Sequence, residues 1–393
     1  MGKFGRRLLG EWALDPEITY LNHGTVGAPP RRVLAKQQEI RDEIERGPSQ
    51  FLLRELTGVA VVGVPRTGPP RIRIAAAAVA EFVGARGDDL VFVDNATTGA
   101  NAVLRSLDLR EGDEILMTDH VYGGILRAAT FAARERGASV RFAELPYPVR
   151  GDGSIVEAVR AALGPRTRVL VLDHITSESA LILPVREIAA LCRAKGISVL
   201  VDGAHAPGAI PLDVPSLGVA WYSANLHKWG MTPRSSAFLW VAPEHREGLH
   251  PTVISWGLDQ GLHAEFDLVG TRDPSPFLAA PEAIAFMREI GVEAMQSHNH
   301  ALAWEAARLL TDRWGTELGM PEEMVGAMAT IPLPERLGST PEDADRVRDL
   351  LLFEDRIEVQ LHAWRGRLWV RVSAQVYNDL TDIERLDTAV RAR

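Results

Sequence analysis

One lysine in the sequence stands among residues that could make its amine reactive. Lys228 lies in the segment "WYSANLHKWGMTPRSSAFLWV", between His227 and Trp229. An exposed lysine is normally a solvated cation, but a lysine flanked by desolvating groups can lose its proton and form a Schiff base with an aldehyde. We therefore asked which other residues could serve such an amine.

Polar side chains follow two apolar segments that we predict to be strands. Asp202 and His205 follow "ISVLV", and Asp173 and Thr176 follow "TRVLVL". A carboxylate in the position of Asp202 is either a turn former or a partner for a cationic ligand nitrogen, and helix capping is the alternative for the second pair. Ligands of α/β proteins bind at the carboxyl ends of the strands, so both pairs are candidate ligand contacts.

Two loops could contact a flat or phosphorylated ligand. In "DNATTGAN", which follows a predicted strand and opens a helix, backbone N–H groups and the hydroxyls of Thr97 and Thr98 could hold a phosphate. A plain helix cap is the alternative. In "TDHVYGG", His120 and Tyr122 could stack on a flat ligand, or they could pack against the protein core.

These groups meet the requirements of one cofactor. A phosphate cradle, an acid for a ring nitrogen, an aromatic ring face and a reactive lysine are what pyridoxal 5'-phosphate needs. We therefore expect this cofactor, with Lys228 as its lysine and Asp202 as its acid. The single cysteine, Cys192, excludes an internal disulfide and a cysteine-based metal cluster, and we expect no metal site.

The elements that must position these residues follow an alternating pattern. From Arg71 to His205, short apolar strands alternate with amphipathic helices, which predicts the α/β class with a mainly parallel sheet covered on both faces. From about Pro281, longer helices and strand-like segments such as "RLWVRVSAQVYND" predict a smaller α+β lobe. The Gly- and Pro-rich stretch from Thr57 to Arg73 is expected to be a surface connection.

Composition favours a protein that acts on small molecules. Among 393 residues there are 43 basic and 52 acidic side chains, giving a formal charge of -9, and no Lys/Arg block suggests a nucleic-acid surface. No run approaches the roughly 18 apolar residues of a membrane span, and the N-terminus does not resemble a signal peptide. We expect a cytoplasmic protein that binds neither nucleic acid nor membrane.

The chain resembles the class V aminotransferase family of fold-type I pyridoxal-phosphate enzymes, and most of all its isopenicillin N epimerase-like branch, which includes carbon–sulfur lyases. The motifs "YLNHGTVGAPP", "NATTGAN", "VDGAHAPG", "NLHKW", "GTRDPS" and "VRVSAQVYN" carry the resemblance over nearly the whole chain. It implies a large domain with a mainly parallel seven-stranded sheet flanked by helices (31–280), a small C-terminal α+β domain (281–393) and an N-terminal arm (1–30). It also implies a homodimer with active sites at the subunit interface.

The resemblance also implies roles for individual residues. Lys228 would form the Schiff base, Asp202 would pair with the pyridine nitrogen, and His205 would lie beside the phenolate oxygen. Arg371 would receive the substrate α-carboxylate, since a guanidinium binds a carboxylate in a two-point fork. The other implied contacts are Thr97, Thr98, Asn225 and His227 at the phosphate, Tyr122 or His120 on the ring, Asp173 and Thr176 near the cofactor, Thr271 at a neighbouring subunit's phosphate, and Asn22 and His23 at the substrate mouth.

The reaction is less defined than the cofactor. Epimerisation, carbon–sulfur elimination, transamination and decarboxylation all begin at the α-carbon of an amino acid, with Lys228 as the natural base for an α-proton. Epimerisation needs a second acid, for which Tyr222 and His23 are candidates. We expect an epimerase or carbon–sulfur lyase for an amino acid with a large or peptide-like side chain. A persulfide mechanism is not expected, because Cys192 is predicted to lie within a helix.

Two departures from the family pattern leave the substrate open. "EFDLVGTRD" lacks an expected tryptophan, and "TSESA" replaces a more usual Ser-Pro. The alternatives are a class V aminotransferase or decarboxylating deaminase, and a non-catalytic binding protein that retains the fold.

Overall fold

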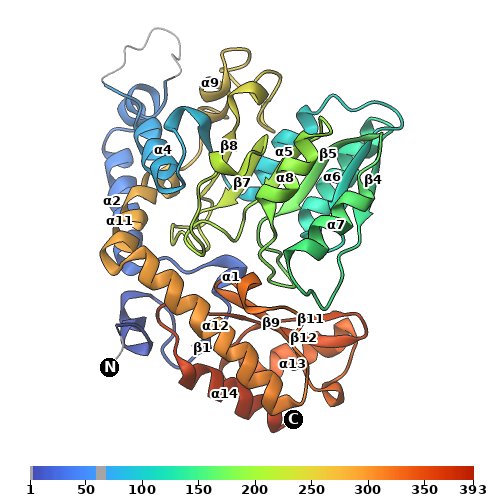
Figure 1. Cartoon of the computed structure of the whole chain (residues 1–393). Coiled ribbons are helices and arrows are strands. Elements are labelled where there is room, and N and C mark those ends of the chain that lie inside the picture. Colours follow the sequence, from blue (N-terminus) through green and yellow to red (C-terminus); the bar gives the residue numbers. More distant parts are fainter. Residues whose placement is uncertain (1–2, 59–67) are drawn as a thin grey trace.

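A computed structural model describes residues 3–58 and 68–393. At its centre is a seven-stranded sheet in the order β2-β8-β7-β6-β5-β3-β4 (Figure 1). β8 runs antiparallel to both neighbours, and the other adjacent pairs are parallel. The predicted α/β class and mainly parallel sheet are thus confirmed. The strands are β2 (Leu90–Val93), β3 (Glu114–Thr118), β4 (Ser139–Ala143), β5 (Thr167–Asp173), β6 (Ser198–Asp202), β7 (Trp221–Asn225) and β8 (Ala237–Val241).

Helices cover both faces of this sheet, which explains why its inner strands are apolar throughout. Along β5, Val169 and Val171 point into one core, whereas Leu170 and Leu172 point into the other. Cys192 is buried within α8, as predicted. Of the stretch from Thr57 to Arg73, residues 59–67 lie outside the described residues. The helices of this part are α2 (Arg31–Arg46), α3 (Pro48–Gln50), α4 (Arg71–Phe82), α5 (Ala96–Ser106), α6 (Gly123–Glu135), α7 (Asp152–Ala162), α8 (Val185–Arg193), α9 (Leu262–Asp267), α10 (Ser275–Leu278) and α11 (Ala280–Ile290).

The C-terminal part is built on a three-stranded antiparallel sheet in the order β11-β12-β9. Its strands are β9 (Met328–Pro332), β11 (Gln360–Trp364) and β12 (Arg367–Ser373). It lies below the large sheet in Figure 1 and packs on α12 (Val292–Trp314) and α13 (Pro341–Phe353). The α+β character of this part is confirmed, while the domain boundaries at residues 30 and 280 stay predictions.

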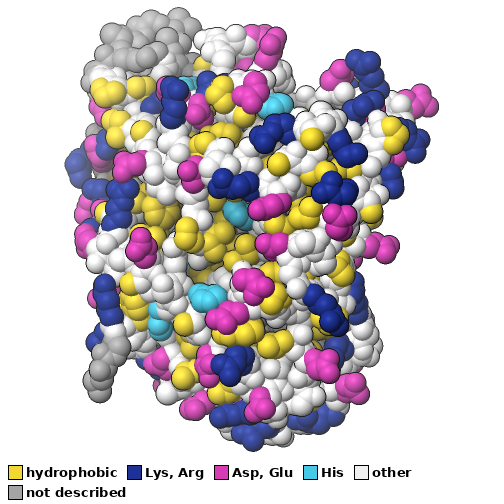
Figure 2. All heavy atoms as spheres, viewed as in Figure 1, with side chains coloured by type: hydrophobic (Ala, Val, Ile, Leu, Met, Phe, Trp, Pro, Cys, Tyr) yellow, Lys and Arg dark blue, Asp and Glu magenta, His cyan; other side chains and the backbone are white. Residues whose placement is uncertain are grey.

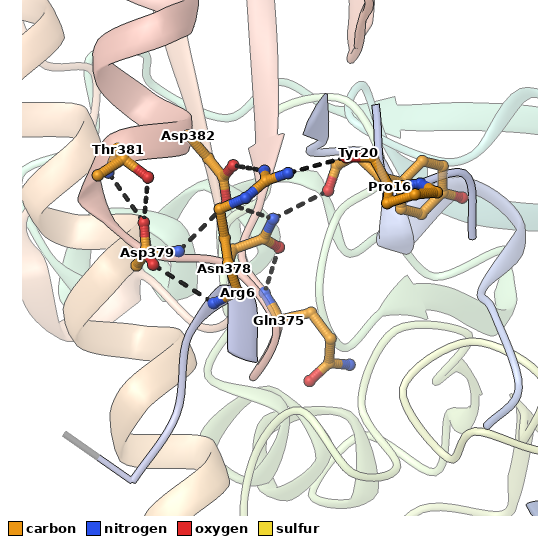
Figure 3. Close-up of polar contacts among 8 residues, drawn as sticks. All are labelled: Arg6, Pro16, Tyr20, Gln375, Asn378, Asp379, Thr381 and Asp382. Atoms are coloured by element: carbon orange, nitrogen blue, oxygen red, sulfur yellow. Dashed lines mark hydrogen bonds and ion pairs between the residues drawn. The ribbon is translucent and has the colours of Figure 1, made fainter. Parts of the chain in front are cut away.

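The N-terminal segment is tied to the C-terminal part of the chain. β1 (Thr19–Tyr20) pairs with β10 (Ile357–Glu358), and α1 (His23–Val26) follows it. Figure 3 shows the contacts that hold this segment beside α14 (Leu380–Arg391). Arg6 Nη1 lies 2.5 Å from Oδ1 of Asp382, a carboxylate with 0% side-chain exposure.

The surface carries mixed charge. Figure 2 shows basic and acidic side chains interspersed over the face in view. Within the part of the chain that the structure describes, no helix combines the length and the apolar character needed to span a bilayer.

Candidate functional site

A cavity of about 420 Å³ lies at the carboxyl ends of β5, β6 and β7. This is the edge at which open α/β sheets bind ligands. The residues that line it include several that the sequence singled out: Thr97, Tyr122, Asp173, Asp202, His205, Asn225, His227 and Lys228.

Lys228 lines this cavity, three residues beyond the C-terminus of β7. Its Nζ lies 3.1 Å from Nε2 of His205. Burial lowers the pKa of Lys228 to about 7, and the charge of Arg371 adds to this effect while Asp202 opposes it. At neutral pH a large share of this amine is therefore unprotonated, which is the form that attacks an aldehyde.

The N-terminal segment packs directly on the backbone of this lysine. The carbonyl oxygen of Lys228 lies 3.1 Å from Nε2 of His23, which must be the donor because a carbonyl can only accept. Burial lowers the pKa of His23 to about 4, so the ring is neutral and Nδ1 accepts from the hydroxyl of Tyr377 at 2.9 Å. Gly27, at φ 65°, lies so close that a Cβ there would be 1.8 Å from the carbonyl oxygen of His227.

Two buried carboxylates stand side by side at the ends of neighbouring strands. Asp173 of β5 pairs in register with Asp202 of β6. Burial raises the pKa of both groups, and for Asp173 the charge of Asp202 raises it further. Asp202 accepts from the backbone N–H of Ala204 at 2.9 Å, whereas Oδ2 of Asp173 is buried without a hydrogen-bond partner among the described residues. The pair therefore favours one negative charge, held by Asp202.

His205 is oriented by a neighbouring indole. Nε1 of Trp229 lies 3.4 Å from Nδ1 of His205 and can only donate, so Nδ1 is the acceptor. Burial holds the pKa of His205 well below its ordinary value, and Lys228 lowers it further. The neutral ring consequently carries its proton on Nε2, which faces the amine of Lys228.

The N-terminus of α5 also lines the cavity, through Asn95, Ala96 and Thr97. Asn95 caps this helix by accepting from the backbone N–H of Thr98 at 2.8 Å, and Oδ1 of Asn225 accepts from the N–H of Ala96 at 2.8 Å. Thr97 lines the cavity. The hydroxyl of Thr98 instead bonds to Asn95 at 3.1 Å and lies outside the lining. A helix N-terminus with a free hydroxyl is suited to an anion.

His227 is another residue of the cavity lining. Its Nδ1 is 3.0 Å from the carbonyl oxygen of Ser236 and donates to it, so Nε2 is the free nitrogen. Burial lowers the pKa of His227 to about 4. A bound anion would oppose that effect and favour the doubly protonated ring.

Arg371 of β12 lies just behind the cavity wall. Its Nη1 donates to the carbonyl oxygen of Ser177 at 2.6 Å, and its Nη2 donates to Oγ1 of Thr25 at 2.7 Å. Thr25 in turn donates to Oδ1 of Asn22 at 2.5 Å. Both Ser177 and Thr25 line the cavity, so Arg371 contacts two residues of its lining. Burial lowers the pKa of Arg371 to about 10, so it keeps its charge.

Several predicted residues lie elsewhere. His120 is hydrogen-bonded to Oγ of Ser179 at 2.7 Å and packs 5.1 Å from Trp364, so Tyr122 is the aromatic that reaches the cavity. Thr176 is also bonded to Ser179, at 2.7 Å, and thereby shapes the loop after β5 instead of lining the cavity.

The two candidate second acids are directed away from the cavity. The hydroxyl of Tyr222 bonds to Nδ1 of His174 at 2.7 Å within the core, because alternation along β7 points this side chain under the sheet. His23 lies behind Lys228. Asn22 reaches the site only through Thr25. Thr271 is exposed and lines a separate small pocket in this chain.

One residue of the cavity lining was not predicted for the site from the sequence. Thr25 lines the cavity and accepts a hydrogen bond from Arg371, from which it is separated by 346 residues, so the sequence held no local signal for this contact. Ser177, a polar residue of the segment that follows β5, also lines the cavity and accepts a hydrogen bond from Arg371.

Comparisons with known proteins identify the family of this chain. The Aminotransferase class-V pattern matches residues 71–339. The chain is 32% identical to a probable chloroplastic L-cysteine desulfhydrase of Arabidopsis thaliana, over 96% of this chain and 83% of that protein. It is 33% identical to the isopenicillin N epimerase of Streptomyces clavuligerus, over 98% of this chain and 96% of that protein.

Solved structures share the fold. The apo cysteine desulfurase from Thermococcus onnurineus NA1 superposes with a TM-score of 0.79 at 18% identity, covering 100% of this chain and 98% of that one. The cystine C-S lyase C-DES superposes with a TM-score of 0.75 at 23% identity, covering 95% and 97%. The match over more than half of the sequence, together with relatives that align over nearly all of it, shows that this chain belongs to the aminotransferase class-V family.

Proposed function

We propose that the chain is a pyridoxal-phosphate enzyme that removes a β-sulfur substituent from an amino acid by elimination. The observation that carries this proposal is the grouping of Lys228, Asp202 and His205 around one cavity in a class V chain. Desulfhydrase and epimerase names among its relatives support chemistry at the α-carbon of an amino acid.

The residues of the cavity fit the cofactor at each end. Asp202, the member of the carboxylate pair that keeps its charge, would hold the pyridine nitrogen. His205, with its proton on Nε2, would donate to the phenolate oxygen, and Tyr122 would cover the ring. The phosphate would lie at the N-terminus of α5, held by Thr97 and by His227.

Each remaining group would then act on the substrate. Bound pyridoxal phosphate supplies the sink for electrons released at the α-carbon. Arg371 orients the substrate through its α-carboxylate, and Thr25 and Ser177 hold the guanidinium in place. Lys228 takes the α-proton, and the β-sulfur leaves as a thiol. Hydrolysis of the remaining three-carbon unit gives pyruvate and ammonia.

Elimination is preferred because it needs one base. Inversion at the α-carbon needs an acid on the opposite face, and the two candidates for that role, Tyr222 and His23, are turned away from the cavity. Epimerisation is the second candidate function, and the 33% identity to isopenicillin N epimerases favours it.

Incubation of the purified holoenzyme with S-substituted cysteines in deuterated water tests both functions. Elimination gives equal amounts of thiol and pyruvate, whereas epimerisation gives an α-deuterated amino acid of inverted configuration. Lys228→Ala should abolish either product. Cys192→Ser should leave thiol release unchanged, because the buried helical thiol of Cys192 takes no part. Failure of every amino acid tested to alter the absorbance of the bound cofactor would refute both functions.

We also propose a homodimer in the cytoplasm. The exposed position of Thr271, outside the cavity of its own chain, supports a contact with the cofactor phosphate of a second copy. We also propose that Asn22 positions Thr25 and that Thr98 positions Asn95. Neither Asn22 nor Thr98 would touch a ligand.

A further inference from the structure

One face of the small antiparallel sheet is polar and turned toward the loops of the large sheet. Thr330 on β9 donates to the carbonyl oxygen of Glu178 at 2.5 Å, and Arg371 on β12 donates to Ser177. Residues that pair directly across neighbouring strands lie on the same face. Trp369, two residues before Arg371, pairs with His362 on β11, so all of these side chains share the face that meets the cavity wall.

His362 is the unexplained residue on this face. Both of its ring nitrogens are shielded from solvent, and neither has a hydrogen-bond partner in residues 3–58 or 68–393. Burial lowers the pKa of His362 to about 4, and the charge of Arg371 lowers it further. The strand register places His362 opposite Trp369, two residues from Arg371 on the same face. The ring is therefore neutral and offers one N–H donor and one nitrogen acceptor.

Two other side chains of this region also carry unsatisfied atoms. Nε of Arg371 and Nε2 of His120 are also buried, again with no partner among the described residues. The aromatic rings of Trp364 and Trp369 lie 5.6 Å apart, and His120 packs 5.1 Å from Trp364. Buried polar groups of folded proteins are nearly always paired, so a cluster of unpaired ones beside a substrate-binding arginine calls for a ligand or ordered water.

We propose that His362, with the indole rings of Trp369 and Trp364, forms a subsite for a substrate side chain that carries a neutral hydrogen-bonding group such as an amide. This proposal rests on the proposed function and on Arg371 as the α-carboxylate contact. A neutral imidazole complements a group that both donates and accepts. A cationic side chain would be repelled by Arg371 and by Arg365, whose guanidinium lies 4.5 Å from the ring of Trp364.

Two isosteric substrates make the test. S-Carbamoylmethylcysteine and S-isobutylcysteine have side chains of similar shape and the same scissile bond, but only the first carries an amide. The wild-type enzyme should favour the amide in kcat/KM by about tenfold or more, since a site that hydrogen-bonds a group rejects an analogue lacking it. His362→Leu should bring that ratio close to one. His362→Gln, which restores a donor and an acceptor, should recover part of it.

His245→Leu is the matched control, because His245 follows β8 at the opposite end of the sheet and should leave the ratio unchanged. Calorimetric dissociation constants of the two compounds with Lys228→Ala give a readout independent of turnover and should show the same preference. An unaltered ratio in His362→Leu would overturn the subsite and would mean that ordered water alone satisfies the ring. If the wild-type enzyme did not exchange the α-proton of alanine with solvent, the proposed function itself would be overturned.

Discussion

At the residue scale, burial decides the protonation states of the site. Lys228 and Asp173 are both shifted toward their neutral forms, the first as a base and the second as an acid. Asp202 faces the same desolvation, but the charge of Lys228 lowers its pKa, whereas the charge of Asp202 raises that of Asp173. The balance leaves one anion and one reactive amine in a single small cavity, which suits a cationic ring nitrogen and an aldehyde carbon.

The first prediction concerns Lys228 in the cofactor-free protein. Because its pKa is lowered to about 7, its amine should become reactive toward an amine-labelling reagent as pH rises through about 7. Peptide mass spectrometry after short labelling at pH 6 to 11 would measure this, with exposed Lys36 as an internal reference. Half-maximal labelling of Lys228 near its ordinary value of 10.5 would contradict the prediction.

The second prediction concerns Asp173. Its folded-state pKa lies above 3.8, so its contribution to stability is complete below that pH and is lost as pH rises through the folded value. Asp173→Asn, which mimics the protonated acid, should therefore stabilise the cofactor-free protein at pH 7 by about 1 kcal/mol or more. Melting temperatures measured from pH 4 to 8 should depend less on pH in Asp173→Asn than in the wild-type protein. Asp202→Asn is the comparison, and it should weaken cofactor binding where Asp173→Asn does not.

At the element scale, the N-terminal segment acts as a brace for the site. α1 contacts the backbone of Lys228 through His23 and accepts a hydrogen bond from Arg371 through Thr25, so the positions of both residues depend on one short helix. That helix follows β1, whose partner strand β10 belongs to the C-terminal part. The contacts drawn in Figure 3 fix this segment in place.

The third prediction follows from that brace. Arg6→Ala leaves the buried carboxylate of Asp382 without its cationic partner and should lower the free energy of unfolding by about 1–3 kcal/mol. The loosened arm should also raise KM, because Thr25 no longer holds Arg371 firmly. Urea unfolding and steady-state kinetics would measure both effects. Arg7→Ala removes an exposed neighbour and should change stability by less than about 0.5 kcal/mol.

At the scale of the whole molecule, an exposed apolar segment suggests where a second copy binds. Val253, Ile254, Trp256 and Leu258 are 54%, 53%, 64% and 44% exposed within one short loop. Soluble monomers rarely expose a contiguous apolar patch without a use. The segment precedes Thr271, for which we propose a role in the partner's site.

The fourth prediction tests this surface. Light scattering during size-exclusion chromatography should give twice the monomer mass for the wild-type protein. Trp256→Asp should shift the population to monomer and reduce activity, because a charge would be buried at the interface. Phe353→Asp is the control, since Phe353 is 74% exposed as a single residue on α13. A wild-type monomer with full activity would contradict the proposed dimer.

The sequence by itself determined the fold class, the family and the cofactor, and it predicted that Asp202 and Lys228 share one site. Asp202 ends β6 and Lys228 lies three residues beyond β7, and the ends of neighbouring strands must meet at one edge of a parallel sheet. The alternation of apolar strands and amphipathic helices likewise predicted a sheet with helices on both faces. These signals are local in the chain, so they could be recognised without coordinates.

Only the tertiary structure decided which of the remaining candidates reach the cavity. Tyr122 lines it while His120, two residues earlier, turns toward Ser179. Thr25 and His362 have no motif that points to Arg371, because contacts between residues hundreds of positions apart depend on how the arm and the small sheet pack. Sequence motifs report on residues close together in the chain, whereas packing sets the direction of each side chain. This is why the cofactor could be predicted and the contacts of Thr25 and His362 with the rest of the site could not.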